Sequence, residues 1–267
     1  MTRARFRDLV AAEWIKVGSL RSTPWTLGLV GLFVIGAAAV AARNDYANFS
    51  SYSAAEQQSH SFSLSDAFPL FGCLALMLVA ASTGAATVVS EYSSGLIRTT
   101  MIAVPARGAV LLAKAVVQSL MWTACGAVIA ALSLAVSQAI LSGRDADVAL
   151  TDPGVLPALA AGTLLAPVCA LIGLGLGVLI RHTATTMITS VVLLVVLPQV
   201  FPGNRPWSTE VKHSMMLSAW QRLTEHYGPP AAVESLYPSL GRSWIVYAIW
   251  PIVVLVTAFI ALRRRDV

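Results

Sequence analysis

The sequence predicts an all-α membrane protein with six transmembrane helices. Six runs contain no Asp, Glu, Lys or Arg, and they cover residues 22–42, 67–90, 115–143, 153–180, 182–204 and 243–262. Each run reaches the length of about 20 residues that a helix needs to cross the hydrocarbon core of a bilayer. Apolar residues are continuous in these runs and do not alternate with polar ones, which favours helices over the strands of a membrane barrel.

Composition agrees with this fold class and leaves little room for a soluble domain. The 267 residues are 57% hydrophobic and 12% charged, whereas a soluble domain has about 25% charged residues. The longest polar segment, residues 205–242, is too short for an independent catalytic domain of ordinary size. We therefore expect a single transmembrane domain over residues 1–267.

The distribution of charge predicts which ends of the helices face the cytoplasm. Segments on the side of the two termini hold 12 of the 18 Lys and Arg residues, and only 4 of the 13 acidic residues. The positive-inside rule therefore places both termini in the cytoplasm. The external loops are then residues 43–66, 144–152 and 205–242. Because the net charge of +5 follows this pattern, we expect no nucleic-acid partner.

The first element, over residues 1–21, is predicted to be an interfacial helix on the inner leaflet. Apolar residues recur there at helical spacing between basic residues, namely Phe6, Leu9, Val10, Trp14 and Val17. Such a helix lies in the membrane surface with its apolar face down. Glu13 interrupts the apolar stripe, and a merely basic leader that sets topology is the alternative.

The six spans are predicted at about residues 25–42, 68–89, 115–141, 155–180, 186–201 and 244–262. We expect the first to be an uncleaved span, because a charged segment of about 24 residues precedes it, which is long for a signal peptide. The third run is too long for a perpendicular span, so its start should project from the membrane. In the fourth, Gly173 and Gly177 would allow a neighbouring helix to approach closely.

Between the last two spans, residues 209–227 have helical composition and aromatic neighbours. Trp and Tyr are enriched where a membrane meets water. We therefore expect short external helices that rest on the outer leaflet, in preference to a disordered loop.

The sequence lacks the residues that ion-coupled transport and several enzymatic activities require. The cores of the spans carry no ionisable group of the kind that ion-coupled carriers use. Motifs of serine hydrolases, zinc proteases and P-loops are absent, and the four histidines are scattered without metal-ligand spacing. We expect no catalytic residue, metal or cofactor in this chain, so that any ATP and Mg would be bound by a separate protein.

The segment 91–114 is the most informative part of the chain. Glu91 is expected to begin a short helical segment that Pro105 ends, with Arg107 and Lys114 flanking the next helix. A short cytoplasmic helix with apolar anchors suits docking to a soluble partner. An ordinary positive-inside loop explains the same residues.

A spaced pattern in this segment resembles a known family. The pattern Glu-x-x-x-Gly-x-x-Arg-(x)6-Pro-x-Arg-(x)6-Lys is formed by Glu91, Gly95, Arg98, Pro105, Arg107 and Lys114. It resembles the loop between the second and third spans of ABC-2-type ABC transporter permease subunits, a family of bacterial exporters. The leader that contains Glu13, Trp14, Lys16 and Arg21 is similar to the one that precedes the first span in that family. Leu96 departs from the Thr of many members, and residues 205–242 show no match.

The resemblance implies a multi-pass subunit of the bacterial plasma membrane that works with a P-loop ABC ATPase subunit and a second permease copy. Residues 91–101 would form a coupling helix in a groove of the ATPase, which would bind ATP and Mg. Glu91 and Arg98 would contact the ATPase, Gly95 would allow close backbone approach, and Pro105 with Arg107 would fix the bend into the third span.

The uncharged spans suit an amphipathic or hydrophobic substrate. The alternatives are a membrane sensor or immunity protein on the same scaffold, and a stand-alone carrier or channel. The missing catalytic groups argue against an intramembrane enzyme.

Overall fold

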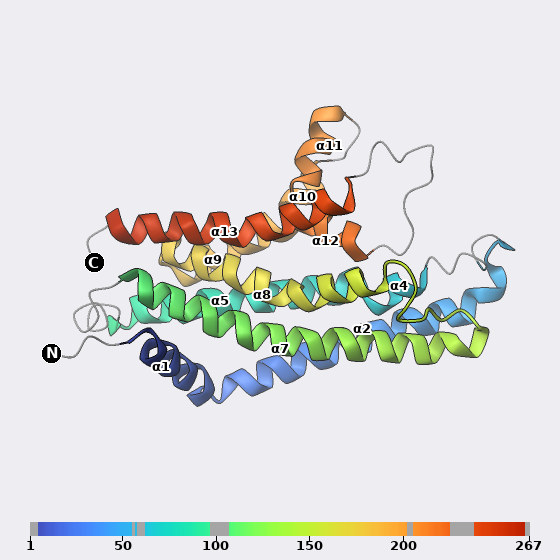
Figure 1. Cartoon of the computed structure of the whole chain (residues 1–267), viewed down its shortest axis with the longest axis horizontal. Helices are drawn as coiled ribbons and strands as arrows, with labels where there is room; N and C mark the ends of the chain where they lie inside the picture. Colours follow the sequence, from blue (N-terminus) through green and yellow to red (C-terminus); the bar gives the residue numbers. More distant parts are fainter. Residues whose placement is uncertain are drawn as a thin grey trace.

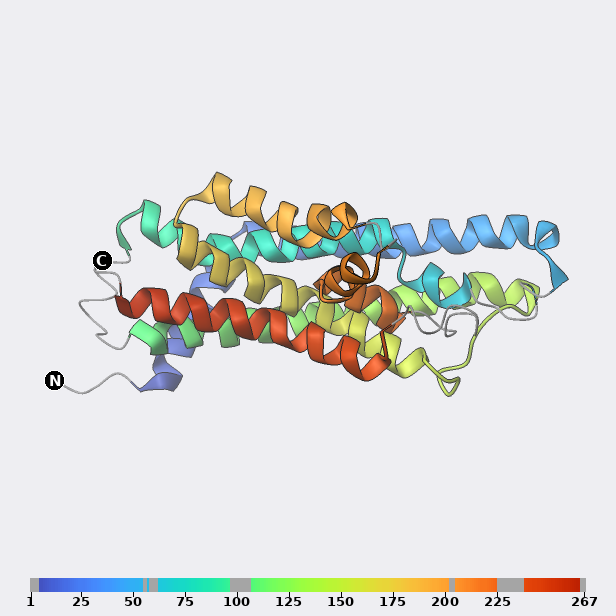
Figure 2. The same ribbon diagram turned by 90° about the horizontal axis from the view of Figure 1, so that it is seen from above.

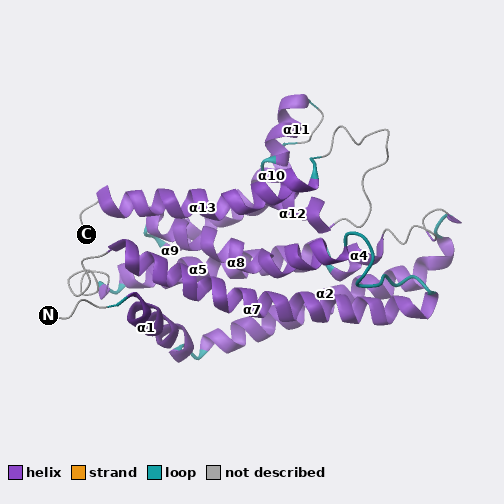
Figure 3. Ribbon diagram, viewed as in Figure 1, coloured by secondary structure: helices purple, strands orange, loops and turns teal. Residues whose placement is uncertain are grey.

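The computed structural model describes residues 5–54, 57, 62–96, 107–201, 205–224 and 238–264. Within these ranges all regular structure is helical, joined by short loops (Figure 3). Six helical segments are long and apolar enough to cross a membrane. The chain is therefore a multi-pass, all-α membrane protein, as the charge-free runs predicted.

Eleven α-helices are found in the described residues. They are α1 (Phe6–Ser19), α2 (Ser22–Asn48), α4 (Phe62–Ala67), α5 (Leu70–Ser93), α7 (Arg107–Leu141), α8 (Val155–Ile180), α9 (Thr183–Val191), α10 (Leu197–Val200), α11 (Pro206–His213), α12 (Met216–Thr224) and α13 (Leu240–Arg264). A π-helical segment, Val192–Val196, joins α9 to α10. The fourth span has the predicted bounds. Helices α2 and α13 extend beyond both predicted ends of their spans, α5 extends beyond the predicted C-terminal end, and α7 begins before the predicted start.

The long helices run side by side along one axis (Figure 1). The end of α5, the start of α7 and the end of α13 lie at the same end of the bundle, which we call the α1 end. There α1 lies across the direction of the other helices, as both views show (Figures 1 and 2). The two described ends of the chain thus lie at the same end of the bundle, as expected for an even number of transmembrane helices.

Helix α8 forms the centre of the bundle and packs closely against α5. A side chain at Gly173 would overlap the backbone carbonyl of Ala81, and one at Gly177 would press on Ala85. A side chain at Gly84 of α5 would in turn overlap the backbone of α8. The predicted close approach at Gly173 and Gly177 is therefore confirmed, and the neighbour is α5.

Two short helices lie between the last two spans. Six of the nine residues of α12 are buried, including Trp220 and Leu223, because this helix packs against α8 and α13. The expected position of these helices on the outer leaflet stays a prediction. Helix α11 projects away from the bundle beside the start of α13 (Figure 1). Of the predicted coupling helix, residues 91–101, the first three residues belong to the end of α5, and residues 97–101 lie outside the described residues.

Candidate functional site

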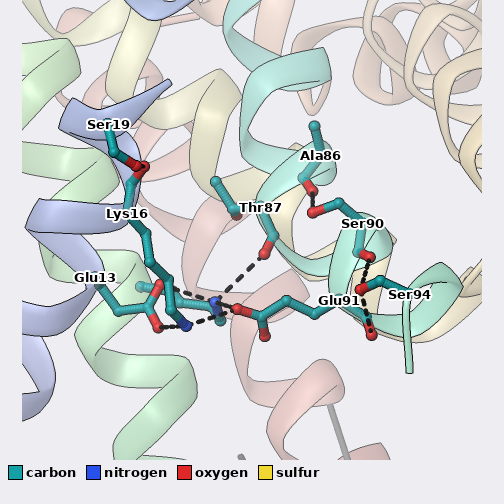
Figure 4. A network of polar contacts seen from close by, with 9 residues as sticks. Glu13, Lys16, Ser19, Ala86, Thr87, Ser90, Glu91 and Ser94 are labelled. Carbon is teal, nitrogen blue, oxygen red and sulfur yellow. Dashed lines mark hydrogen bonds and ion pairs between the residues drawn. The ribbon is translucent and has the colours of Figure 1, made fainter. Parts of the chain in front are cut away.

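Four charged side chains meet at the α1 end of the bundle, where they form what we call the ion cluster. Glu13 and Lys16 come from α1, Glu91 from the last turn of α5, and Lys114 from the start of α7. Figure 4 shows Glu13, Lys16 and Glu91 pointing toward one another. Three elements that are far apart in the sequence are thus joined through charge.

Lys114 lies at the centre of the ion cluster. Its Nζ donates to Glu13 Oε2 at 2.8 Å, to Glu91 Oε1 at 2.7 Å and to the carbonyl oxygen of Thr87 at 3.3 Å. An ammonium has three hydrogens to donate, and the three acceptors match that number. Only 3% of the Lys114 side chain is exposed. These contacts therefore replace the water molecules that would solvate the ammonium on the surface.

Lys16 makes a second bridge between the same two carboxylates, from the solvent side. Its Nζ donates to Glu13 Oε1 at 2.8 Å and to Glu91 Oε1 at 2.9 Å, while half of its side chain stays exposed. Burial by itself would lower the pKa of Lys16, but hydrogen bonds and attraction to Glu13 and Glu91 outweigh it and raise the pKa. Lys16 is therefore charged at neutral pH.

The ion cluster is balanced in charge, and its interior is nearly dry. Two carboxylates face two ammonium groups, and Glu13 and Glu91 are each 6% exposed. Charges at this depth are tolerated only when they are paired and hydrogen-bonded. One oxygen, Glu91 Oε2, is buried and has no hydrogen-bond partner among the described residues. Removing either lysine would leave a carboxylate without its counter-charge.

Local sequence places each member of the ion cluster. In α1, Glu13 lies on the face that turns toward the bundle, whereas Trp14 and Ile15 are exposed. The apparent flaw in the apolar stripe is therefore the contact that attaches α1. At the end of α5, Gly95 has a φ of +73°, a conformation that glycine adopts without strain and that ends helices. Glu91 consequently lies in the last turn of a long helix.

The structure brings together four of the residues that the sequence patterns singled out, and it corrects the place of Glu91. This residue was expected to begin a separate helix, and its expected contact with a partner protein stays a prediction. It lies instead inside α5, and its carboxylate contacts Lys16 and Lys114 of its own chain. Lys114 likewise lies within α7 and not in a loop, because both helices extend into the predicted loop.

The other predicted residues lie outside the ion cluster. Trp14 is 52% exposed, and Arg21 is an exposed residue directly before α2. Arg107 begins α7. Arg98 and Pro105 lie outside the described residues. No described residue lies within 4 Å of the position that a side chain at Gly95 would take, and Gly95 follows the end of α5 with a positive φ.

Sequence reasoning missed one neighbouring contact. Arg181, in the turn after α8, stacks its guanidinium on the ring of Tyr92 with 4.7 Å between the guanidinium carbon and the ring centroid. Arg181 has a φ of +60°, in the left-handed region. The cation–π contact holds the end of α8 against the end of α5. The sequence indicated only that Arg181 occupies a tight turn.

The ion cluster is a junction at which paired charges join α1, α5 and α7. Among the described ranges, no group of three or more His, Cys, Asp and Glu side chains could hold a metal ion. Comparison with known protein families finds no matching family model, and comparison with curated proteins finds no match.

Proposed function

We propose that this chain is the membrane-spanning subunit of an ATP-driven exporter of the bacterial plasma membrane, paired with a second permease copy and coupled to a separate P-loop ATPase subunit. The observation that supports the proposal is the ion cluster. It joins the two segments whose residues resemble ABC-2-type permeases, the leader with Glu13 and Lys16 and the segment from Glu91 to Lys114.

The arrangement suits transmission of force from a soluble motor. The segment between Glu91 and Lys114 connects α5 to α7 at the α1 end, which the positive-inside rule predicts to be cytoplasmic. A push on that segment would move the ends of both helices. Because Lys114 and Lys16 bind carboxylates of α1 and α5 together, α1 would move with them as one body. Rigid-body shifts of this kind switch transporters between states.

In this proposal the chain does no bond chemistry. ATP and Mg would be bound by the ATPase subunit, and the substrate would be amphipathic or hydrophobic, since the spans present apolar and uncharged surfaces. Glu91 would contribute through its hold on α1 and α7, and not through a direct contact with the ATPase.

The first experiment is purification of the chain from its native membrane in mild detergent and in lipid nanodiscs, followed by mass spectrometry. A P-loop ATPase in near-stoichiometric amount is the expected result. A preparation free of any ATPase in both media would overturn the proposal and favour a sensor, carrier or channel.

A matched pair of variants then tests where the ATPase binds. Leu96 is 57% exposed and follows the end of α5, whereas Leu150 is 59% exposed in the loop at the opposite end. Leu96→Asp should abolish co-purification of the ATPase, because a buried charge weakens an apolar contact. Leu150→Asp should leave co-purification unchanged. If the two variants co-purified with equal amounts of the ATPase, docking at the α1 end would be excluded.

A further inference from the structure

A cavity of about 260 Å³ lies beside the ion cluster. The junction of α1 and α2 forms one wall, and α5 and α7 form the others, with Leu27, Thr83, Gln118 and Trp122 among the lining residues. Ser90, at its edge, is exposed. The cavity therefore lies at the α1 end of the membrane span and opens between helices.

The lining is amphipathic and carries no charge. Apolar side chains from α2 and α7 lie beside hydroxyl groups of α5. Thr87 donates its hydroxyl to the carbonyl of Gly84 at 2.7 Å. Thr83 donates to Ala80 at 2.9 Å and accepts from Trp122 Nε1 at 3.0 Å. Because the hydroxyl donors of Thr83 and Thr87 are used within the protein, these two hydroxyls offer only acceptor oxygens to a ligand.

Gln118 supplies the second observation. It is 2% exposed and lines the cavity, yet its Oε1 has no hydrogen-bond partner among the described residues. A buried polar group without a partner costs free energy, so a natural partner is expected. An amide offers both an acceptor and a donor, and a hydroxyl group satisfies both. A charged group would find no counter-charge on this lining.

We infer that this cavity binds a neutral single-chain amphiphile with a hydroxyl-bearing head, oriented with the head toward Gln118 and the chain along the apolar wall. Its volume of about 260 Å³ is below the range of roughly 300–1,000 Å³ of pockets for drug-sized ligands, and a small pocket favours one chain over two. The inference stands on the cavity alone and does not depend on an ATPase partner.

The test uses a monoacylglycerol with a photoreactive diazirine in its chain, added to the full-length protein in phosphatidylcholine nanodiscs. Mass spectrometry should find the label on the lining peptides of α5 and α7. Ala86 is exposed and lines the cavity, so Ala86→Phe should fill the cavity and reduce this labelling about tenfold, since labelling follows occupancy. Ala131, exposed on α7 outside the cavity, provides the control Ala131→Phe, which should label like wild type. Labelling that is insensitive to Ala86→Phe would overturn the site.

Gln118→Leu tests recognition of the head. It should weaken competition by unlabelled monoacylglycerol about threefold to tenfold, as expected for one lost hydrogen bond. Labelling by a diazirine alkane without a head should not change, and this second probe reports that the variant is folded. If Gln118→Leu leaves competition unchanged, or if phosphatidylcholine chains compete equally well, the cavity does not recognise a hydroxyl head and the inference is refuted.

Discussion

The ion cluster and the Glu210–Arg242 pair use the same chemistry in opposite surroundings. In the cluster, the side chains of Glu13, Glu91 and Lys114 are between 3% and 8% exposed. The Arg242 and Glu210 side chains, which join α13 to α11, are 41% and 61% exposed. Water screens the second pair and hardly reaches the first.

This difference determines what each contact does for the protein. An exposed ion pair contributes little, because water solvates both groups equally well when they separate. A buried network contributes little more than well-packed apolar residues would, but it is very sensitive to the loss of one member. The cluster therefore specifies where α1 attaches, whereas the exposed pair only adds a weak contact at the start of α13.

The largest effect is expected from Lys114→Met. Methionine resembles the lysine stem in shape and removes the buried cation of the ion cluster, so two carboxylates remain with the half-exposed Lys16. We expect a loss of about 3–5 kcal/mol of stability. The measurement is the midpoint of thermal unfolding in one detergent, followed by intrinsic fluorescence.

Arg242→Met is the matched control for that experiment. It breaks the exposed pair by the same change of residue type, and it should shift the midpoint only slightly. If the two variants lost equal stability, burial would not distinguish the two contacts and the comparison would be broken.

An intermediate effect is expected from Glu13→Gln. This variant keeps the shape of the side chain but removes the charge that Lys114 and Lys16 bind, so α1 should detach more readily. Loss of hydrogen bonds to a charged group costs about 1.5–3 kcal/mol. Hydrogen exchange of the amides of α1 should accelerate while that of α8 stays slow. Asp8→Asn, at a 59% exposed position of the same helix, should leave α1 protected, and acceleration in both variants would show that Glu13 is not the anchor.

Much of the fold could be predicted from the sequence because a bilayer imposes a simple requirement on each span. Charge-free runs of sufficient length identified all six helices. Residues 209–227 were expected to form external helices because they have helical composition and aromatic neighbours, but the packing of the apolar side of α12 between α8 and α13 was not predicted. Local composition does not reveal which tertiary surface will cover a short helix.

The four residues of the ion cluster could be identified from the sequence, but the contacts among them could not. Glu13, Lys16, Glu91 and Lys114 were singled out separately by resemblance to two motifs. Their contact depends on α1 lying across the ends of α5 and α7, which is a property of the tertiary arrangement. One signal was present in the sequence, since Glu13 breaks an apolar stripe, and a charge on such a stripe requires a buried partner.

The smallest effect is expected for the pH dependence of the stability that the exposed Glu210–Arg242 pair contributes. A hydrogen bond from Arg242 and attraction to Arg242 and His213 lower the pKa of Glu210 below its ordinary value of 4.5. A lowered pKa means that the folded state favours the charged carboxylate, so the pair stabilises the protein above pH 4.5 and this contribution is lost as pH falls through the lower value. The difference in unfolding midpoint between wild type and Glu210→Gln should therefore be small at pH 6, begin to shrink as pH falls below 4.5, and vanish only below the lowered pKa of Glu210. A difference that grows on acidification would reverse the sign and show that the fold favours a protonated Glu210.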